Sequence, residues 1–295
     1  MGIQIKDIET GNATIMIGEQ GQPITDVQKD QAFNSLEKSG ALLLRGFDVD
    51  LGSFSEFVGK MCSKVTLDPA RTFFESNVQK VDAGTAPVGL HTENSNTPFP
   101  PDLVFFYCRK AASNGSQTTL CDGQVVWRFL SDDTRSLFRD HQLRISRNIS
   151  EPHWKEYVAF ETEGLNSADE VTMEHFEAFR HRVPNQKIEL QDDMSIFYSL
   201  DAPGARKSLV SKQWAFANSI MGPSYNYEKP LITFDNDQAI SDEILEEIRV
   251  VTEAVTKEVQ WQDGDVVMID NTRVMHGRRE ITDTNRELFI GLGYL

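Results

Sequence analysis

The sequence predicts a mainly β protein with flanking helices (α+β), folded as a distorted jelly roll, the double-stranded β-helix. Short apolar runs, separated by turns rich in glycine, proline and asparagine, recur along the chain and are typical of buried strands. A few segments with helical spacing of their apolar residues lie between these runs. The sequence contains neither an internal repeat nor a low-complexity segment.

The N-terminal part predicts two helices on either side of a strand. Thr25 with Gln28 forms a capping-box pattern that opens a helix ending near Gly40. Three consecutive leucines shortly after that glycine indicate a buried strand. Ser53 with Glu56 then opens a second, short helix.

An extended segment from Leu90 is expected to carry His91 and Glu93 on one face, because side chains alternate along a strand. The loop at 94–101 is rich in asparagine, serine, threonine and proline, and it ends this strand. The apolar run at 103–108 then indicates another buried strand.

The second half predicts further helices before a C-terminal pair of strands. Residues 125–141 have a helical pattern in two pieces, and 168–180 form a polar helix. The segment 241–259 is the clearest helix, because its apolar side chains recur at spacings of three or four residues. That stripe consists of Ile244, Ile248, Val251, Val255 and Val259. A turn at 261–265 precedes the strand at 266–269.

At 295 residues, the chain is expected to form one domain, 1–295, with a mobile lid insertion around 150–190. The sequence shows neither the roughly 18 apolar residues of a transmembrane helix nor a signal peptide. The three widely spaced cysteines, Cys62, Cys108 and Cys121, favour reduced thiols in a cytoplasmic protein over a disulfide framework.

The formal net charge of −16 argues against nucleic acid and anionic membranes as partners, because both demand a basic surface. The expected partner is a small molecule. If that molecule or a co-substrate is anionic, local arginines must overcome the field of the whole chain. The sequence gives no indication of the oligomeric state.

Two histidines and one acid form the most informative pattern. His91-Thr92-Glu93 supplies an imidazole and a carboxylate, and His276 supplies a second imidazole far downstream. This is the ligand set of a mononuclear non-haem Fe(II) oxygenase, which holds one face of the metal and leaves the other open. Taken alone, His-x-Glu is common and fits a polar pair on a strand edge equally well. The downstream residues around His276 favour the metal site.

Three further side chains are candidates for binding. Arg286 lies ten residues after His276, on a predicted returning strand, where its guanidinium fork suits the distal carboxylate of a 2-oxo diacid. A surface arginine is the simpler alternative. Asn94, next to the metal acid, is a candidate substrate contact. Asp237 would recognise a substrate amine or guanidine, although its simplest role is to end a strand.

With these motifs, the chain resembles the taurine dioxygenase/2,4-dichlorophenoxyacetate dioxygenase superfamily of Fe(II)/2-oxoglutarate-dependent oxygenases. The resemblance extends from the segment 40–47 to Arg286. It is similar to the branch that acts in amino-acid and natural-product biosynthesis. The resemblance implies that His91, Glu93 and His276 bind Fe(II). It also implies that Thr118, in Gly-Ser-Gln-Thr, and Arg286 bind 2-oxoglutarate.

The sequence departs from the family pattern at three places. The metal acid is glutamate, as in the arginine and asparagine hydroxylases and clavaminate synthase, which act on amino-acid-like substrates. A Gly-Ser pair replaces Gly-Gly before Thr118. Gly291 stands where some members have a second arginine, and Arg278 or Arg279 is the candidate to replace it.

The resemblance implies a dioxygenase that uses Fe(II), 2-oxoglutarate and O2 to oxidise an unactivated C–H bond of a small amino-acid-like substrate, free or bound to a carrier protein. Hydroxylation is expected, with desaturation or cyclisation as alternatives. Two other classes fit part of the pattern: a zinc-dependent hydrolase or lyase on a jelly-roll scaffold, and a non-catalytic binding protein with a degenerate site. Thr118 and Arg286 speak against the former, and the intact ligand set speaks against the latter.

Overall fold

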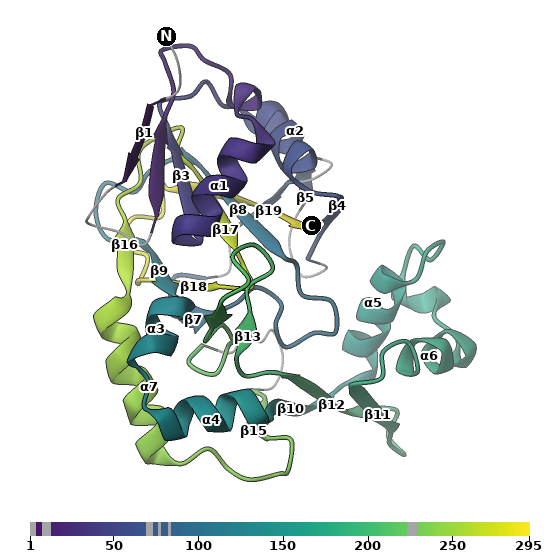
Figure 1. Cartoon of the computed structure of the whole chain (residues 1–295). Helices are drawn as coiled ribbons and strands as arrows, with labels where there is room; N and C mark the ends of the chain where they lie inside the picture. Colours follow the sequence, from purple (N-terminus) through teal and green to yellow (C-terminus); the bar gives the residue numbers. More distant parts are fainter. Residues whose placement is uncertain (1–3, 8–12, 69–72, 76–77, 82–83, 223–228) are drawn as a thin grey trace.

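Two β-sheets enclose an apolar core, as expected for a jelly roll, and helices cover their outer faces (Figure 1). The structure, a computed structural model, describes residues 4–7, 13–68, 73–75, 78–81, 84–222 and 229–295. The larger sheet has the order β1-β2-β3-β17-β8-β19-β6-β5, with β4 beside β19. Its strands are β1 (Gln4–Asp7), β2 (Thr14–Ile17), β3 (Ala41–Arg45), β4 (Lys64–Thr66), β5 (Phe73–Glu75), β6 (Val78–Lys80), β8 (Leu103–Lys110), β17 (Val266–Asp270) and β19 (Glu287–Tyr294).

The smaller sheet has the order β16-β9-β18-β7 and faces the larger one. Its strands are β7 (Val88–His91), β9 (Thr118–Asp122), β16 (Lys257–Val259) and β18 (Val274–Arg278). Strand β17 explains why the predicted strands are apolar throughout. Val267 and Ile269 contribute to the core between the sheets, whereas Val266 and Met268 contribute to the core beneath the helices. Both faces of this strand are therefore buried.

Helices α1 (Lys29–Ser39) and α2 (Leu51–Met61) cover the outer face of the larger sheet (Figure 1). Helix α1 ends as predicted at Gly40, which adopts a left-handed conformation with φ 72° that suits glycine. Its predicted start was wrong, because Thr25 lies in a short 3-10 helix (Ile24–Asp26) and Gln28 is extended. The start of α2 was also wrong: Asp50 caps it, and Ser53 is the reciprocal partner in that capping box.

A second group of helices packs behind the smaller sheet. As predicted, residues 125–141 form two helices, α3 (Gly123–Phe129) and α4 (Asp132–Asp140). The long helix α7 (Asp242–Val255) begins within one residue of the predicted start at Ser241, which is its N-cap, and packs apolar side chains in the same core. Its predicted end at Val259 was wrong, because residues 257–259 pair with β9 as strand β16.

A third sheet, in the order β11-β12-β10-β15, carries the segment expected to be a lid. Its strands are β10 (Gln142–Ile149), β11 (Gln186–Leu190), β12 (Ile196–Pro203) and β15 (Leu231–Phe234), and a short pair, β13 (Arg206–Lys207) and β14 (Trp214–Ala215), follows β12. Helices α5 (Glu151–Glu161) and α6 (Met173–Arg180) share an apolar core with β11 and β12 and project beside the two main sheets (Figure 1). We call residues 150–190 the lid segment. The single polar helix predicted at 168–180 is instead a 3-10 turn (Ala168–Glu170) followed by α6, and α5 was not predicted.

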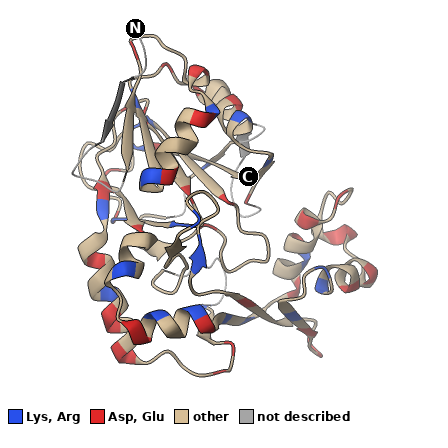
Figure 2. Cartoon of the chain, viewed as in Figure 1, with Lys and Arg blue, Asp and Glu red and all other residues tan. Residues whose placement is uncertain are grey.

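Acidic side chains line α7 and the outer parts of the lid segment (Figure 2). Within the described residues, no helix is both long and apolar enough to cross a membrane.

Candidate metal centre

His91 and His276 meet because their strands pair. Strand β7 runs antiparallel to β18, and the two histidines are opposite each other in the register. Directly opposed residues of an antiparallel pair share one face of the sheet. The two ring centroids are accordingly 4.4 Å apart, although 185 positions separate the residues in sequence. Pairing of β7 with β18 thus brings two of the three cluster residues together.

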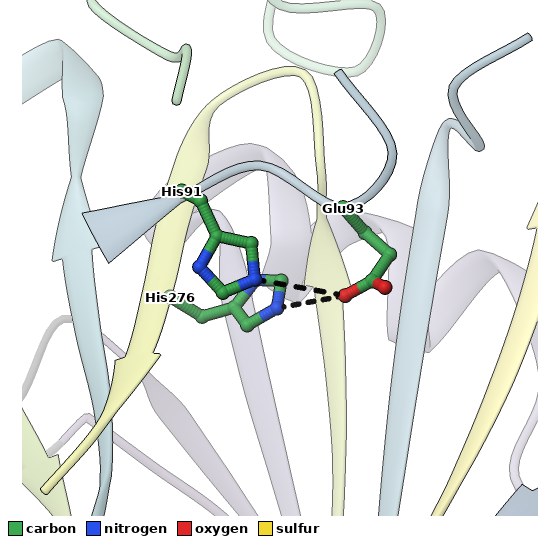
Figure 3. A group of neighbouring side chains, drawn as sticks. All are labelled: His91, Glu93 and His276. Atoms are coloured by element: carbon green, nitrogen blue, oxygen red, sulfur yellow. Dashed lines mark hydrogen bonds and ion pairs between the residues drawn. The ribbon is translucent and has the colours of Figure 1, made fainter. Parts of the chain in front are cut away.

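Glu93 completes the cluster from the turn after β7 (Figure 3). Its Oε2 lies 3.1 Å from Nε2 of His276 and 3.9 Å from Nε2 of His91. The prediction that Glu93 continues the strand was wrong, since β7 ends at His91. The turn nevertheless returns the carboxylate to the two rings, so one ligand atom from each residue lies within 4.8 Å of the others.

The surroundings hold these groups in position. Nδ1 of His91 lies 2.9 Å from the carbonyl oxygen of Gly89, and a proton donated there leaves the Nε2 lone pair directed at the cluster. The His276 ring packs edge-on against Phe106 at 5.3 Å. All three cluster residues are buried. Two imidazoles and a carboxylate that converge in this way fit a divalent transition metal, with the remaining positions open.

Asn271 contacts the backbone of Glu93, and the sequence reasoning missed it. It lies in the turn between β17 and β18, and its Oδ1 accepts a hydrogen bond from the Glu93 amide at 2.8 Å. Its Nδ2 donates to the carbonyl oxygens of Glu93 at 3.1 Å and Pro101 at 2.8 Å. Ser219 bonds the neighbouring residue, Thr92, through both backbone groups. The Asp270-Asn271 pair before His276 is visible in the sequence, but the sequence does not indicate that Asn271 bonds the backbone of Glu93 and Pro101.

Two of the predicted co-substrate residues, Thr118 and Arg278, lie on strands β9 and β18 beside His276. Thr118 is on β9 and lies opposite Arg278 of β18. Leu120, two positions further along β9, lies opposite His276. Its Oγ1 accepts a hydrogen bond from the Trp261 indole at 3.0 Å. Thr118 and Arg278 are therefore buried beside the cluster, as a co-substrate contact requires.

Arg286 and Arg278 place two buried cations near each other. The prediction that Arg286 lies on the returning strand was wrong by one residue, because β19 begins at Glu287. Arg286 is 9% exposed and donates from Nη1 to the carbonyl oxygen of Ser116 at 3.0 Å. Its Nη2 is buried and has no hydrogen-bond partner among the described residues. Burial, with a smaller contribution from the charge of Arg278, lowers the pKa of Arg286 to about 10. An incoming carboxylate would satisfy the orphaned nitrogen and offset the repulsion, so the residues fit a dicarboxylate co-substrate.

The two predicted substrate contacts lie in different places. Asn94 adopts a left-handed conformation with φ 54°, directly after the metal acid, and lines a pocket beneath the lid segment. Asp237 occupies an exposed turn after β15, where its Oδ1 accepts a 2.7 Å hydrogen bond from Arg144. Its position therefore gives no support to a role in substrate binding, whereas that of Asn94 does.

The pocket beneath the lid segment encloses about 1010 Å³, its open mouth included. One wall is the loop that follows Glu93, from Asn94 to Phe99, and the opposite walls come from α5, α6, β10 and β12. The pocket therefore begins at the residue next to the metal acid and extends into the apolar core of the lid segment.

Comparisons with known proteins identify the family of this chain. The sequence model of the family described as "Taurine catabolism dioxygenase TauD, TfdA family" matches residues 10–291. The dapdiamide synthesis protein DdaC of Enterobacter agglomerans is 24% identical over 271 residues, which cover 83% of this chain and 79% of that protein. A clavaminate synthase-like protein of Arabidopsis thaliana is 24% identical over 294 residues, covering 88% and 84% of the two chains.

Among solved structures, PvcB of Pseudomonas aeruginosa superposes with a TM-score of 0.64 at 15% identity, covering 99% of this chain and 92% of PvcB. This similarity confirms the jelly-roll fold. Because the family match spans nearly the whole chain and includes all three residues of the cluster, the chain belongs to the TauD/TfdA family and is an Fe(II)/2-oxoglutarate-dependent dioxygenase.

Proposed function

We propose that His91, Glu93 and His276 hold the Fe(II) ion, and that Arg286, Arg278 and Thr118 bind 2-oxoglutarate. The observation that carries this assignment is the buried His-Glu-His cluster, together with two buried arginines that lie near each other, Arg278 and Arg286. When bound, iron and 2-oxoglutarate together activate O2 and oxidise a substrate C–H bond.

The protein side chains would position these groups. The hydrogen bond from His91 to Gly89 directs one imidazole, and Asn271 holds the backbone that carries the Glu93 carboxylate. The Arg286 fork would bind the distal carboxylate of 2-oxoglutarate, Thr118 would donate its hydroxyl proton to the same group, and Arg278 would add positive charge. Burial of the cluster would keep bulk water from the reacting atoms.

We further propose that the substrate is a small amino-acid-like molecule, free or attached to a carrier protein, and that hydroxylation is the reaction. The glutamate ligand and Asn94 at the pocket entrance support this substrate class. Similarity to a dapdiamide synthesis protein supports a role in biosynthesis. We also propose that residues 1–295 form one domain, with the lid segment over the pocket, and that the protein has a cytoplasmic location. The latter is supported by the three free, buried cysteines.

Alanine substitution of the three proposed ligands tests the metal assignment. His91→Ala, Glu93→Ala and His276→Ala should each abolish iron-dependent formation of succinate from 2-oxoglutarate, because each removes one of only three protein ligands. Glu93→Asp should lower activity and not abolish it, since it keeps the charge on a shorter arm. The matched control is His181→Ala, which removes an exposed histidine that pairs with Glu177.

Near-normal succinate formation by any of the three alanine variants would contradict the assignment. A zinc hydrolase could use the same ligands, but it would need no 2-oxoglutarate. Anaerobic titration separates these cases. A visible charge-transfer band should appear only when both Fe(II) and 2-oxoglutarate are present, and a non-catalytic binding protein would show neither the band nor succinate.

A further inference from the structure

The floor of the pocket beneath the lid segment carries a guanidinium and a phenol on an otherwise apolar face. Strands β10 and β12 pair so that Arg147 lies opposite Tyr198, and β11 places Ile188 on the other side of Tyr198. The three side chains form one row across the sheet, and all three line the pocket. Along β10, the neighbours of Arg147 on this face are Ile145 and Ile149, both buried.

Tyr198 is buried without a hydrogen-bond partner. Its side chain is 5% exposed, and its hydroxyl finds no acceptor or donor among the described residues. Burial raises the pKa of this phenol, while the nearby Arg147 charge opposes the rise, which confirms that the two groups are neighbours. A buried hydroxyl without a partner is unusual in a core and is a common feature of a ligand-binding surface.

Aromatic side chains form the walls above this floor. Trp154 and Phe176 pack with ring centroids 5.0 Å apart, and Tyr157 and Phe179 pack edge-on at 5.7 Å. Phe99, from the loop after Glu93, also lines the pocket. Such a pocket suits a flat or extended apolar group.

Two acids limit the charge that the pocket accepts. Asp68 and Glu161 also line it, and Glu161 pairs with Arg182 at 3.3 Å. Because these two acids repel anions, a ligand with a single negative charge beside Arg147 meets less repulsion than a phosphate dianion.

Resting on the proposed function, we propose that Arg147 and Tyr198 recognise the carboxylate of a substrate whose aromatic or long apolar body fills the pocket between the lid segment and the Asn94–Phe99 loop. The guanidinium and the phenol would both donate to the carboxylate, and the apolar body would lie against Trp154 and Tyr157. The reacting end would extend past Asn94 toward the cluster.

Binding of 3-phenylpropionate, compared with its uncharged amide 3-phenylpropanamide, tests this proposal. Isothermal titration calorimetry of the full chain, without added iron or 2-oxoglutarate, should show the acid binding roughly tenfold more tightly than the amide. Arg147→Gln should remove this preference, and Arg147→Lys should restore part of it. Tyr198→Phe should reduce the preference and leave the fold intact, because the lost hydroxyl has no partner in the described part of the chain.

The matched control is Lys187→Gln. Lys187 lies on β11 of the same sheet and pairs with Glu189, so the substitution removes one positive charge outside the pocket and should leave the preference unchanged. Equal binding of acid and amide by the unmodified protein, or no binding of either, would overturn the proposal even if Arg147→Gln failed to fold. Because the assay needs neither metal nor turnover, its failure is distinguishable from failure of the oxygenase assignment.

Discussion

At the scale of single residues, the effect of Arg286 on the free energy of unfolding depends on whether an anion is bound beside it. Arg286 is a buried cation with one unsatisfied nitrogen, and Arg278 is its charged neighbour. The pKa of Arg286, about 10, lies below the ordinary 12.5 of arginine. The folded protein therefore binds this proton more weakly than the unfolded chain does, which destabilises the fold at neutral pH. That penalty fades as the pH rises past about 10, or when an anion binds.

Arg286→Met should therefore stabilise the unliganded protein while removing its response to the co-substrate. At pH 7 the free energy of unfolding should rise by on the order of 1 kcal/mol, because methionine carries no charge to bury. Stabilisation by N-oxalylglycine, an unreactive analogue of 2-oxoglutarate, with Mn(II) should be lost. Urea unfolding with and without these ligands measures both effects.

The control for this substitution is Arg279→Met, which removes an arginine whose partner is the surface residue Glu258. It should change neither the stability nor the ligand response by more than a few tenths of a kcal/mol. If Arg286→Met were less stable than the unmodified protein and still responded fully to N-oxalylglycine, the arginine would be a structural side chain.

At the scale of elements, periodicity predicted the apolar strands and the stripe of α7, because burial on one or both faces leaves a direct signature. Element ends were harder to predict. Val259 continues the helical spacing of α7, yet pairing with β9 makes it a strand residue. The three residues of the cluster could be named from their chemistry, but the register that pairs His91 with His276 is a long-range property. Arg147 and Tyr198 carried no local signal, since only the third sheet brings them together.

The turn between β17 and β18 carries Asn271, which holds the backbone of Glu93 in position. Asn271→Ala should lower metal affinity by about 10- to 100-fold, because the Glu93 backbone loses two hydrogen bonds that fix it. Stability should also fall by about 1–3 kcal/mol, since buried backbone groups lose their partner. Co(II) binding followed by calorimetry, together with urea unfolding, separates the two effects.

Asn218→Ala supplies the matched control for the turn. Asn218 is also buried, donates to the Gly204 carbonyl oxygen and accepts from the Ile220 amide. Its loss should reduce stability to a similar extent without a comparable change in metal affinity. Equal effects of the two variants on Co(II) binding would mean that Asn271 acts only through general stability.

At the scale of the whole molecule, the loop after Glu93 links the His-Glu-His cluster to the lid segment. Its far end is held by Asn271 through the Pro101 carbonyl oxygen. Between these points, Phe99 packs against the apolar core of the lid segment, and the Arg182 guanidinium lies 4.5 Å from the Phe99 ring centroid. A ligand in the pocket would touch the loop and the lid segment together. Their stabilities should therefore be coupled.

Hydrogen–deuterium exchange measures this coupling. Saturating 3-phenylpropionate should slow amide exchange in 94–101 and in the lid segment by similar factors, because closing the pocket orders both walls. Helix α7, which packs in a separate core, should exchange at an unchanged rate and serves as the internal control. In Tyr198→Phe, protection of both segments should weaken together, because one donor for the carboxylate is lost. The coupling would be contradicted if the ligand slowed exchange in the lid segment but left exchange in 94–101 unchanged. In that case only the lid segment would respond to the ligand.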